Sequence, residues 1–317
     1  MGGDHSPEEI VKGGVAAARD EGIEVVLVGQ EEVVRGELAK QDFADPRIDV
    51  ANATEVVGMD ERPVLAIKEK RDSSIVVGME LLRKGEVAAF VSAGNTGAVM
   101  TAACLILGKR KGIHRPALGA VFPFHTGPVL CLDLGANADC KAGWLVQFAH
   151  MGSIYMEKVF EIENPRVGLL SSGEEDTKGS QEVQKANKML RKAKVNFIGN
   201  IEGRHIASGI ADVIVTDGFT GNVVLKLGEG IGEMLVGSLW KAVTENPSLK
   251  TSADLLEPTF RSVIGTLDYR QYGGALLFGV NRSVIVAHGR SDARAIKSAM
   301  VAAKRTVALE LAEAIKG

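Results

Sequence analysis

Residues 213–227 read VIVTDGFTGNVVLKL, a pattern that predicts a strand, a tight turn and the start of a helix. The apolar run 213–215 is typical of a strand covered on both faces, and the glycines allow a sharp turn. A helix that begins directly after a strand directs its first backbone N–H groups at the turn, where an anion such as phosphate binds well. Asp217, Thr220 and Asn222 add polar side chains there. The stretch therefore predicts an α/β fold with an anion site at this junction.

The rest of the chain repeats this alternation of β-rich runs and helical patterns, which indicates an α/β protein with a largely parallel sheet. At 317 residues the chain is long enough to bury a large core. We expect one α/β/α domain over residues 1–317, with two lobes around a cleft. Strands are expected at residues 24–28, 88–91, 117–122, 129–132, 166–170, 196–198 and 212–215, and helices at 7–21, 62–83, 96–108, 141–160, 178–193, 221–243 and 292–315.

Residues 224–264 depart from the alternation. Apolar residues recur at Leu227, Ile231 and Leu235, and a second helical pattern follows, which predicts a helical hairpin inserted in the domain. Core packing is the default interpretation of such an apolar stripe. Trp240 and Phe260 leave two alternatives open, a dimer surface and a face that rests on the membrane, of which we favour the dimer surface.

The N-terminus raises a separate expectation. Ser6, Pro7 and Glu9 form a capping-box pattern, which predicts a helix from about residue 7. A glycine-rich turn such as Gly2-Gly3 in front of a helix normally follows a strand in α/β proteins. We therefore expect that a strand belongs in front of this turn and is missing from the sequence.

The composition argues against several functions. A formal charge of −3 disfavours nucleic-acid binding, which needs a strongly basic face. No apolar run approaches the length of a membrane-spanning helix, and no signal-peptide pattern is present. The six histidines have no metal-ligand spacing, and no nucleotide-binding glycine loop is found, so we expect neither a metal nor a cofactor. The three cysteines lie among apolar residues, which indicates buried thiols in a reducing cytoplasm.

A second strand–loop–helix junction begins at Ser92. Its small residues allow close approach of the backbone to a ligand, and Ser92, Asn95 and Thr96 supply polar side chains beside Gly97. An ordinary capped helix is the alternative, because Ser, Asn and Thr are favoured at helix starts in any case.

Two more junctions carry polar residues. Asp133 and Asn137 follow an apolar strand, the usual place for site residues in α/β sheets, although turn chemistry alone also explains them. Lys178 lies at a predicted helix start, where a cation is unfavourable unless an anion is near. It is either a solvated lysine or one aimed at a phosphate or a developing oxyanion. Taken together, these loops predict an enzyme that handles a phosphate-bearing or acyl substrate.

Two further features lie outside these junctions. His288 is the histidine best placed for a site, with a packed, hydrogen-bonded histidine as the alternative. Lys109, Arg110 and Lys111 form the one short basic cluster. Such a cluster is usually a solvated helix end, and any partner that binds it should be acidic.

The loops together resemble the acyl-carrier-protein-dependent phosphate acyltransferases of bacterial phospholipid synthesis. The resemblance covers essentially the whole chain, and the ordered set of motifs is more specific than any single loop. It implies a fold related to phosphotransacetylases and isopropylmalate-type dehydrogenases, and usually a homodimer. The matching motifs are MGGDH at 1–5, SAGNTGA at 92–98, DLGAN at 133–137, NIEGR at 200–204, DGFTGNV at 217–223, YGG at 272–274 and AHG at 287–289.

The implied reaction is attack of inorganic phosphate on an acyl carrier protein thioester, which gives acyl phosphate and free carrier. On this reading, backbone N–H groups of residues 92–97 and of the turn at Thr220, Gly221 and Asn222 hold phosphate. Lys178 and Asn222 stabilise the oxyanion, Asp217 orients phosphate or takes its proton, and His288 protonates the leaving thiol.

The resemblance also implies a function for two surfaces. Lys109, Arg110 and Lys111 would steer the acidic carrier protein. The hairpin at 224–264 would form a wall for the acyl chain or a surface resting on the membrane. We therefore expect a cytoplasmic enzyme, with peripheral contact at the inner face of the membrane as the finer expectation.

Three alternatives stay open at this point. A phosphate acetyl- or butyryltransferase that uses coenzyme A has the same fold and chemistry. A non-catalytic descendant that binds acyl carriers is another. An isopropylmalate-type dehydrogenase is disfavoured because it needs a metal-binding set of aspartates and a nucleotide loop, neither of which the sequence contains.

Overall fold

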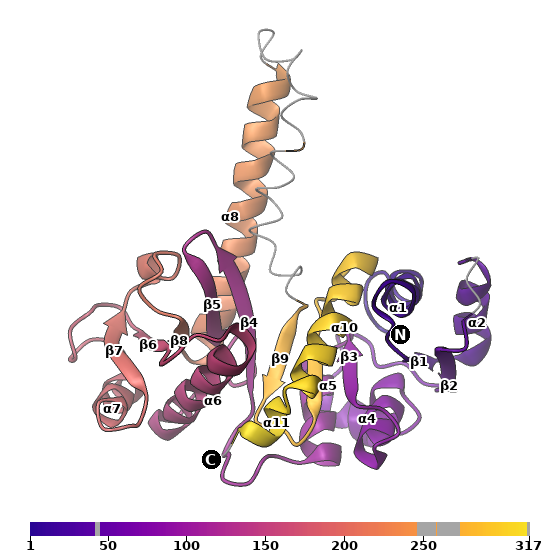
Figure 1. Cartoon of the computed structure of the whole chain (residues 1–317), viewed down its shortest axis with the longest axis horizontal. Coiled ribbons are helices and arrows are strands. Elements are labelled where there is room, and N and C mark those ends of the chain that lie inside the picture. Colours follow the sequence, from indigo (N-terminus) through magenta and orange to yellow (C-terminus); the bar gives the residue numbers. More distant parts are fainter. Residues whose placement is uncertain (42–44, 246–257, 259–272, 316–317) are drawn as a thin grey trace. The chain divides into compact units, whose positions relative to one another are not determined.

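The computed structural model describes residues 1–41, 45–245, 258 and 273–315 (Figure 1). The chain divides into two compact units, and β4 and α6 have residues in both. The expectation of a single domain with two lobes around a cleft stays a prediction. Unit 1 comprises Met1–Ala120, Ile154–Glu163 and Arg270–Gly317, and unit 2 comprises Val121–Ser153 and Asn164–Tyr269.

The elements of unit 2 are strands β5 (Gly127–Leu132), β6 (Arg166–Leu170), β7 (Asn196–Ile201) and β8 (Val213–Val215), helices α6 (Ala142–Phe160), α7 (Gln181–Leu190) and α8 (Gly218–Glu245), and the 3-10 turn η2 (Gly203–His205). The strands follow the order β5-β8-β6-β7, and each neighbouring pair is parallel. All of β8 is buried, as are the last four residues of β6. Burial on both faces explains why these strands are apolar throughout.

The elements of unit 1 are strands β1 (Val25–Gly29), β2 (Ile48–Asn52), β3 (Ala89–Ser92), β4 (Ala117–Phe124), β9 (Ala275–Phe278) and β10 (Ser283–Val286), helices α1 (Glu8–Glu21), α2 (Glu31–Ala39), α3 (Pro63–Glu69), α4 (Ser74–Lys84), α5 (Thr96–Ala102), α10 (Ala293–Ala308) and α11 (Leu311–Ala314), and the π-helical turn η1 (Ala103–Leu107). Four strands follow the order β3-β10-β9-β4, with β3 and β10 parallel and β9 antiparallel to both of its neighbours. β1 and β2 form a separate parallel pair.

Helix α1 packs on β1 through an apolar stripe. Val11, Val15 and Ala18 lie three or four residues apart and contact Val25 and Leu27 in one buried cluster. The same helix contacts α10, and the two lie side by side in Figure 1. This packing fixes the position of the loop in front of α1.

All seven expected strands are present. The sequence did not predict α2, β2, β9 or β10, because these elements are short and β9 and β10 lie between glycines. The helix expected at 62–83 is wrong as a single element, since α3 and α4 are separate. Between them, Asp72 accepts hydrogen bonds from the N–H and the hydroxyl of Thr54, and these contacts stop the helix. The helix expected at 292–315 is likewise divided at Glu310, whose φ is +48°.

The predicted capping box is also wrong. α1 begins at Glu8 with Pro7 as its N-cap, and no side chain caps it. Ser6 Oγ instead accepts a hydrogen bond from Gly3 N, and the Glu9 carboxylate accepts one from Ala293 N. The sequence pattern was right about where a helix starts and wrong about the partners of its polar residues.

The first arm of the predicted hairpin is α8, which begins at Gly218, three residues before the expected start. The second arm falls in residues 246–264, which apart from Pro258 lie outside the described residues. The hairpin as a whole therefore stays a prediction.

Candidate functional site

The candidate site of unit 2 lies at the carboxyl edge of its parallel sheet. β5, β8 and β6 are neighbours in the sheet, so the loops that follow them leave from one edge. The loop after β5 carries Asp133 and Asn137, and the loop after β8 carries Asp217 and leads into α8. The loop after β6 carries Lys178. The sheet order thus gathers three sequence-predicted segments that are up to 84 residues apart in the chain, from Asp133 to Asp217.

Asp133 holds the loop after β5 together. Its side chain is fully buried and accepts hydrogen bonds from the N–H groups of Gly135, Ala136 and Asn137, at 3.3, 2.9 and 2.7 Å. The Asn137 amide donates a fourth bond, at 2.9 Å. Because all four of these hydrogen bonds come from residues of the same loop, the Asp133 carboxylate stabilises the conformation of the loop that forms the site. Substrate binding by Asp133 and Asn137 stays a prediction.

Asp217 caps α8. Its two carboxylate oxygens accept hydrogen bonds from Thr220, one from the backbone N–H at 2.8 Å and one from the hydroxyl at 2.9 Å. Gly221 follows where no other residue fits, because a Cβ there would lie 1.9 Å from the carbonyl oxygen of Asp133. Gly218 N also donates to Asn137 O, at 2.8 Å. The start of α8 is therefore locked against the loop after β5.

This locking uses the backbone donors that the sequence suggested for phosphate. Thr220 N donates to the Asp217 side chain, and Gly221 N donates to Asp217 O at 2.9 Å. Within the described residues, the side chains of Asn222 and Lys178 are exposed and engage no hydrogen-bond or ion-pair partner. Among the residues that the sequence singled out at this edge of unit 2, the side chains of Asn222 and Lys178 therefore remain as donors for a substrate.

The loop that carries Lys178 is held by a buried amide pair that the sequence analysis did not single out. Asn187 on α7 is fully buried and donates to Asn200 Oδ1 at 2.9 Å and to Asp176 Oδ1 at 3.2 Å. Asn200 donates to Glu175 O at 2.9 Å. The available signal was the spacing of Asn187, which falls on the buried face of α7 with Val183, Ala186 and Leu190.

The candidate site of unit 1 is the loop after β3. Asn95 is buried and caps α5, since its Oδ1 accepts from Ala98 N at 3.0 Å. Its Nδ2 donates to the carbonyls of Gly58, Met59 and Glu61. Ser92 Oγ accepts from Gly94 N at 3.1 Å. Ser92 and Asn95 therefore shape the loop.

Two backbone donors remain at the start of α5. In the part of the chain that the structure describes, the N–H groups of Thr96 and Gly97 have no acceptor. Both N–H groups are available to phosphate oxygens, and phosphate binding by residues 92–97 stays a prediction.

His288 lies in the loop after β10. Because β10 is parallel to β3, this loop and the loop at Ser92 leave the same edge of the sheet. His288 Nδ1 accepts a hydrogen bond from Arg290 N at 3.1 Å. That bond places the proton of the neutral ring on Nε2. Asp4 N donates to Gly289 O, which brings the N-terminal loop to the same place.

The basic cluster is only partly available. Arg110 is half-buried and donates to the carbonyls of Glu313 and Ile315, so it holds the C-terminal end of the described chain. Lys109 is exposed while donating to His114 O, and Lys111 is exposed. Docking of a carrier through this cluster stays a prediction, with Lys109 and Lys111 as its accessible charges.

Burial governs the chemistry of the thiols near the site. Burial, with Asp133 nearby, raises the pKa of Cys140 to about 12, and burial alone raises that of Cys131 to about 12. Neither thiol is therefore a nucleophile near neutral pH.

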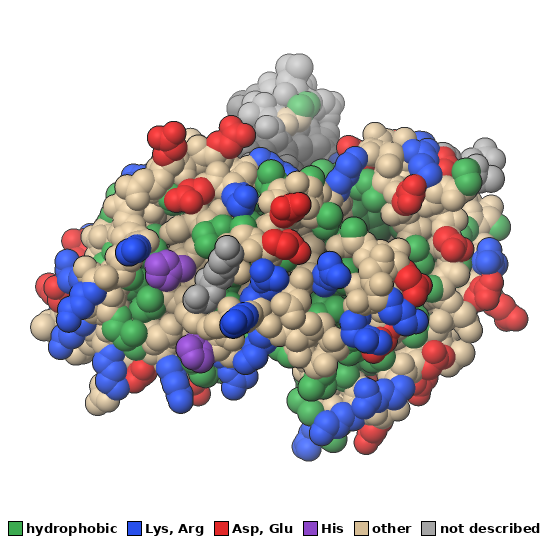
Figure 2. Space-filling view, turned by 60° about the horizontal axis from the view of Figure 1, so that its bottom comes forward, with side chains coloured by type: hydrophobic (Ala, Val, Ile, Leu, Met, Phe, Trp, Pro, Cys, Tyr) green, Lys and Arg blue, Asp and Glu red, His purple; other side chains and the backbone are tan. Residues whose placement is uncertain are grey.

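Three findings bear on partners. Among the described residues, no group of His, Cys, Asp and Glu has a metal-binding arrangement. No helix that the structure describes is long and apolar enough to cross a membrane. Charges of both signs are interspersed on the face drawn in Figure 2, in keeping with the net charge of −3.

The parallel sheet and its loop-borne site define an α/β protein of the phosphotransacetylase fold. A phosphotransacetylase from Streptococcus pyogenes aligns with a TM-score of 0.64 at 20% identity, covering 98% of this chain and 92% of that one. A phosphotransacetylase from Staphylococcus aureus aligns with a TM-score of 0.62 at 15% identity, covering 97% and 91%. Both likenesses concern the fold alone.

The chain belongs to the family described as fatty acid synthesis protein, whose model matches residues 1–314. A phosphate acyltransferase from Thermoanaerobacter pseudethanolicus is 48% identical over 317 residues, which are 100% of this chain and 94% of that protein. A phosphate acyltransferase from Dictyoglomus thermophilum is 47% identical over 313 residues, which are 98% and 93%.

Proposed function

We propose that this chain is an enzyme that transfers a fatty acyl group from an acyl carrier protein thioester to inorganic phosphate, giving acyl phosphate for phospholipid synthesis. The observation that carries the proposal is the pair of unengaged donors, Lys178 and Asn222, on two loops at the carboxyl edge of the unit 2 sheet. Relatives named phosphate acyltransferases at close to half identity support phosphate as the acceptor.

The reaction requires the protein mainly to bind the two substrates and to stabilise the charge that develops. A phosphate oxygen attacks the thioester carbon, and the carbonyl electron pair moves onto its oxygen. Collapse of that oxyanion breaks the C–S bond, and the sulfur leaves as a thiol after taking up a proton. Phosphate is itself the nucleophile, so no covalent enzyme intermediate is needed. Lys178 contributes a positive charge and Asn222 an N–H donor, both of which stabilise the oxyanion.

The other site residues bind and orient. The free N–H groups of Thr96 and Gly97 bind phosphate oxygens. Asp217 acts by fixing Thr220, whose N–H and hydroxyl it holds, so it orients the start of α8. His288 donates a hydrogen bond from its Nε2–H to the leaving sulfur, and the proton that the sulfur takes up comes from the hydroxyl group of the attacking phosphate.

The carrier protein docks on Lys109 and Lys111, because acyl carrier proteins are acidic. Steering between opposite exposed charges weakens with salt. We expect kcat/KM for the acylated carrier to fall steadily as salt rises, and to fall further in a variant with both lysines changed to Glu. The rate with acyl-coenzyme A serves as the control. A carrier reaction indifferent to salt and to both changes contradicts this docking surface.

Helix α8 supplies the contact surface of a homodimer. Its exposed apolar side chains recur every four residues at Val223, Leu227, Ile231, Leu235 and Leu239. Changing Leu227 and Leu235 to Lys should produce monomers in sedimentation velocity. Retained dimers with lost binding to anionic vesicles would instead assign the face to peripheral contact with the cytoplasmic side of the membrane.

The reaction is tested with palmitoyl carrier protein and phosphate, by following free carrier thiol and acyl phosphate together. Lys178→Ala should lower kcat by roughly 10²–10³-fold, the usual loss for one oxyanion donor. Lys188→Ala, an exposed lysine on α7, is the matched control and should stay within about twofold. Equal rates for both variants contradict the role of Lys178. Turnover of acyl-coenzyme A in preference to the carrier thioester would favour the coenzyme A-dependent alternative.

A further inference from the structure

The first turn of helix α8 exposes one large apolar side chain. Phe219 is 68% exposed, the highest fraction among the large apolar side chains that the structure describes. A single exposed apolar residue is common on protein surfaces, so exposure alone assigns no role to it. The position of Phe219 within the candidate site of unit 2 makes it informative, because it lies between Asp217 and Asn222 in the chain.

The residues of this turn differ in what they face. Gly218 and Gly221 are buried, and a Cβ added to Gly221 would lie 1.9 Å from the carbonyl oxygen of Asp133. Phe219 and Asn222, by contrast, are both exposed. Because these two are three residues apart in one helix, their side chains are neighbours, with Cβ atoms about 5–6 Å apart. An aromatic ring and a free amide therefore border the same patch of surface.

The proposed reaction places hydrocarbon at this patch. Asn222 is one of the two donors assigned to the oxyanion, so the acyl carbon lies next to it when phosphate attacks. The first carbons of the acyl chain are bonded to that carbon and lie within the same short distance. Contact between these carbons and the exposed ring of Phe219 removes apolar surface from water on both sides, which favours the contact.

We propose that Phe219 binds the acyl chain next to the thioester and thereby makes the enzyme prefer long-chain acyl donors. The assignment rests on the proposed acyl transfer, because it uses the position of the acyl carbon at Asn222. The ligand is a fatty acyl thioester, whose hydrocarbon chain gives the ring an apolar partner and leaves the Asn222 amide to the thioester oxygen.

The dimer contact proposed for α8 extends farther along the helix. Leu235 follows Phe219 by 16 residues. In an α-helix this separation corresponds to about 24 Å along the axis and about 160° around it. A partner can therefore cover Leu235 without covering Phe219, and the two roles are separable by mutation.

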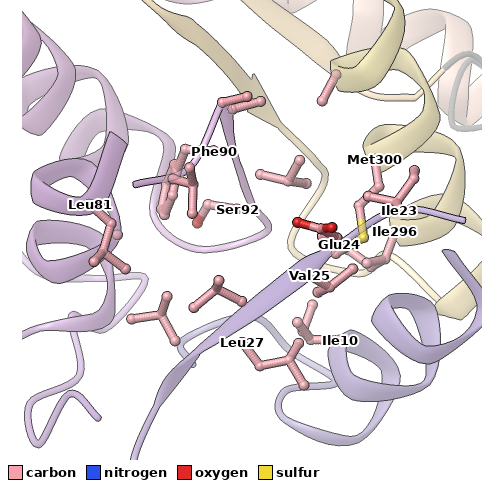
Figure 3. Close-up of a pocket in the computed structure, with 18 of the residues that line it drawn as sticks. Ile10, Ile23, Glu24, Val25, Leu27, Leu81, Phe90, Ser92, Ile296 and Met300 are labelled. Carbon is pink, nitrogen blue, oxygen red and sulfur yellow. The ribbon is translucent and has the colours of Figure 1, made fainter. Parts of the chain in front are cut away.

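A larger apolar space lies in unit 1, a cavity of about 810 Å³. Figure 3 shows Val25, Leu27, Phe90 and Met300 around it. Asn222 does not line this cavity and belongs to the other unit. Because Phe219 is a neighbour of Asn222 in the same helix, the carbons nearest the thioester are assigned to Phe219 and not to the cavity.

The test compares palmitoyl and acetyl carrier protein as donors for the wild type, Phe219→Ala and Phe219→Leu. Phe219→Ala should raise KM for palmitoyl carrier roughly tenfold, the effect of leaving about 55 Å² of apolar surface in water. Because this contact is equal in the ground state and the transition state, kcat and KM for phosphate should stay within about twofold. The kcat/KM for acetyl carrier should not change, since the acetyl group is too short to reach the ring. Phe219→Leu keeps an apolar side chain and should restore most of the affinity.

Ile198→Ala is the matched control, because Ile198 is an exposed apolar residue on β7, the strand at the end of the sheet order. It should leave both donors unaffected. Equal losses with palmitoyl and acetyl carrier overturn the assignment, since they show that Phe219 only positions Asn222. An unchanged KM for palmitoyl carrier in Phe219→Ala also overturns it and redirects the search to the cavity.

Two further readouts separate the other roles of this surface. Dissociation of a wild-type dimer by Phe219→Ala in sedimentation velocity makes Phe219 a subunit contact and overturns the assignment. Loss of binding to anionic vesicles, with KM unchanged, does the same in favour of a membrane contact. A wild type without phosphate-dependent turnover of either donor refutes the proposed function itself, whereas wild-type turnover with the same chain-length preference in Phe219→Ala refutes the role of Phe219 alone.

Discussion

The position most sensitive to a small change is Gly221. Gly221→Ala adds one methyl group in the first turn of α8, 1.9 Å from the carbonyl oxygen of Asp133 and 3.0 Å from Thr216 Cγ2. The closer contact must grow to about 3.0 Å, so the two backbones have to separate by about 1.1 Å. Because the clash is with a backbone atom, no side-chain rotation relieves it.

The separation has two measurable consequences. Overpacking of this kind costs about 1–3 kcal/mol, and the strained bond from Gly218 N to Asn137 O costs about 1 kcal/mol more. The better helix propensity of Ala offsets about 1 kcal/mol. The net loss of about 1–3 kcal/mol lowers the unfolding midpoint by roughly 2–10 °C. A displacement of Asn222 by about 1 Å lowers kcat by roughly 100-fold.

The matched control is Gly228→Ala in the same helix, where a new Cβ meets no atom within 4 Å. It should raise the midpoint slightly and leave kcat unchanged, since Ala is the better helix former. Thermal unfolding and phosphate-dependent release of carrier thiol are measured for both variants. Wild-type stability and activity in Gly221→Ala, or an equal loss in Gly228→Ala, would refute the reasoning.

Three further predictions concern stability and reactivity. Burial raises the pKa of the Asp212 carboxyl group, but hydrogen bonds from the Arg166 side chain and N–H outweigh this effect and lower the pKa below 3.8. The stability that the ionised carboxylate adds is therefore complete above pH 3.8 and is lost as the pH falls through the lowered pKa. Asp212→Asn should cost about 1–2 kcal/mol near pH 7 in urea unfolding, and the difference from wild type should shrink as the pH falls below 3.8. Cys140 should resist alkylation at pH 8 in the folded protein, because its pKa is about 12, and rapid labelling without unfolding would contradict that burial. Asn187→Ala should cost about 1–3 kcal/mol and raise the exchange rate of the Lys178 amide, which donates to Glu175 O in that loop, whereas a loss of stability without faster exchange there would show that the amide pair does not hold the loop.

The elements that sequence patterns predicted are those with local signals. The junction at Asp217 was recognisable because an apolar strand, glycines and a helical stripe follow one another within 15 residues. β9 and β10 were missed because each has only four residues and lies between glycines, which is too short for a periodic pattern to be recognised. They are strands because each pairs with neighbours from distant parts of the chain.

At the candidate site, too, local sequence signals were recognisable and contacts between distant residues were not. Residue types and spacing selected the loops that bear Asp133, Asp217 and Lys178, but not the partners of their side chains. Asp133 and Asp217 accept hydrogen bonds from their own loops, whereas the side chain of Lys178 has no partner among the described residues. Asn187 was overlooked because a single polar residue on a helix face has no function until its neighbours are known.

The sequence by itself determined the fold class, the family and the loops in which polar residues gather, because strand, turn and helix signals act over a few residues. The tertiary structure alone decided the sheet order and which donors remain for a substrate. The physical reason is that hydrogen-bonding groups are satisfied by whatever lies near them in space. Which groups those are depends on contacts between residues far apart in the chain.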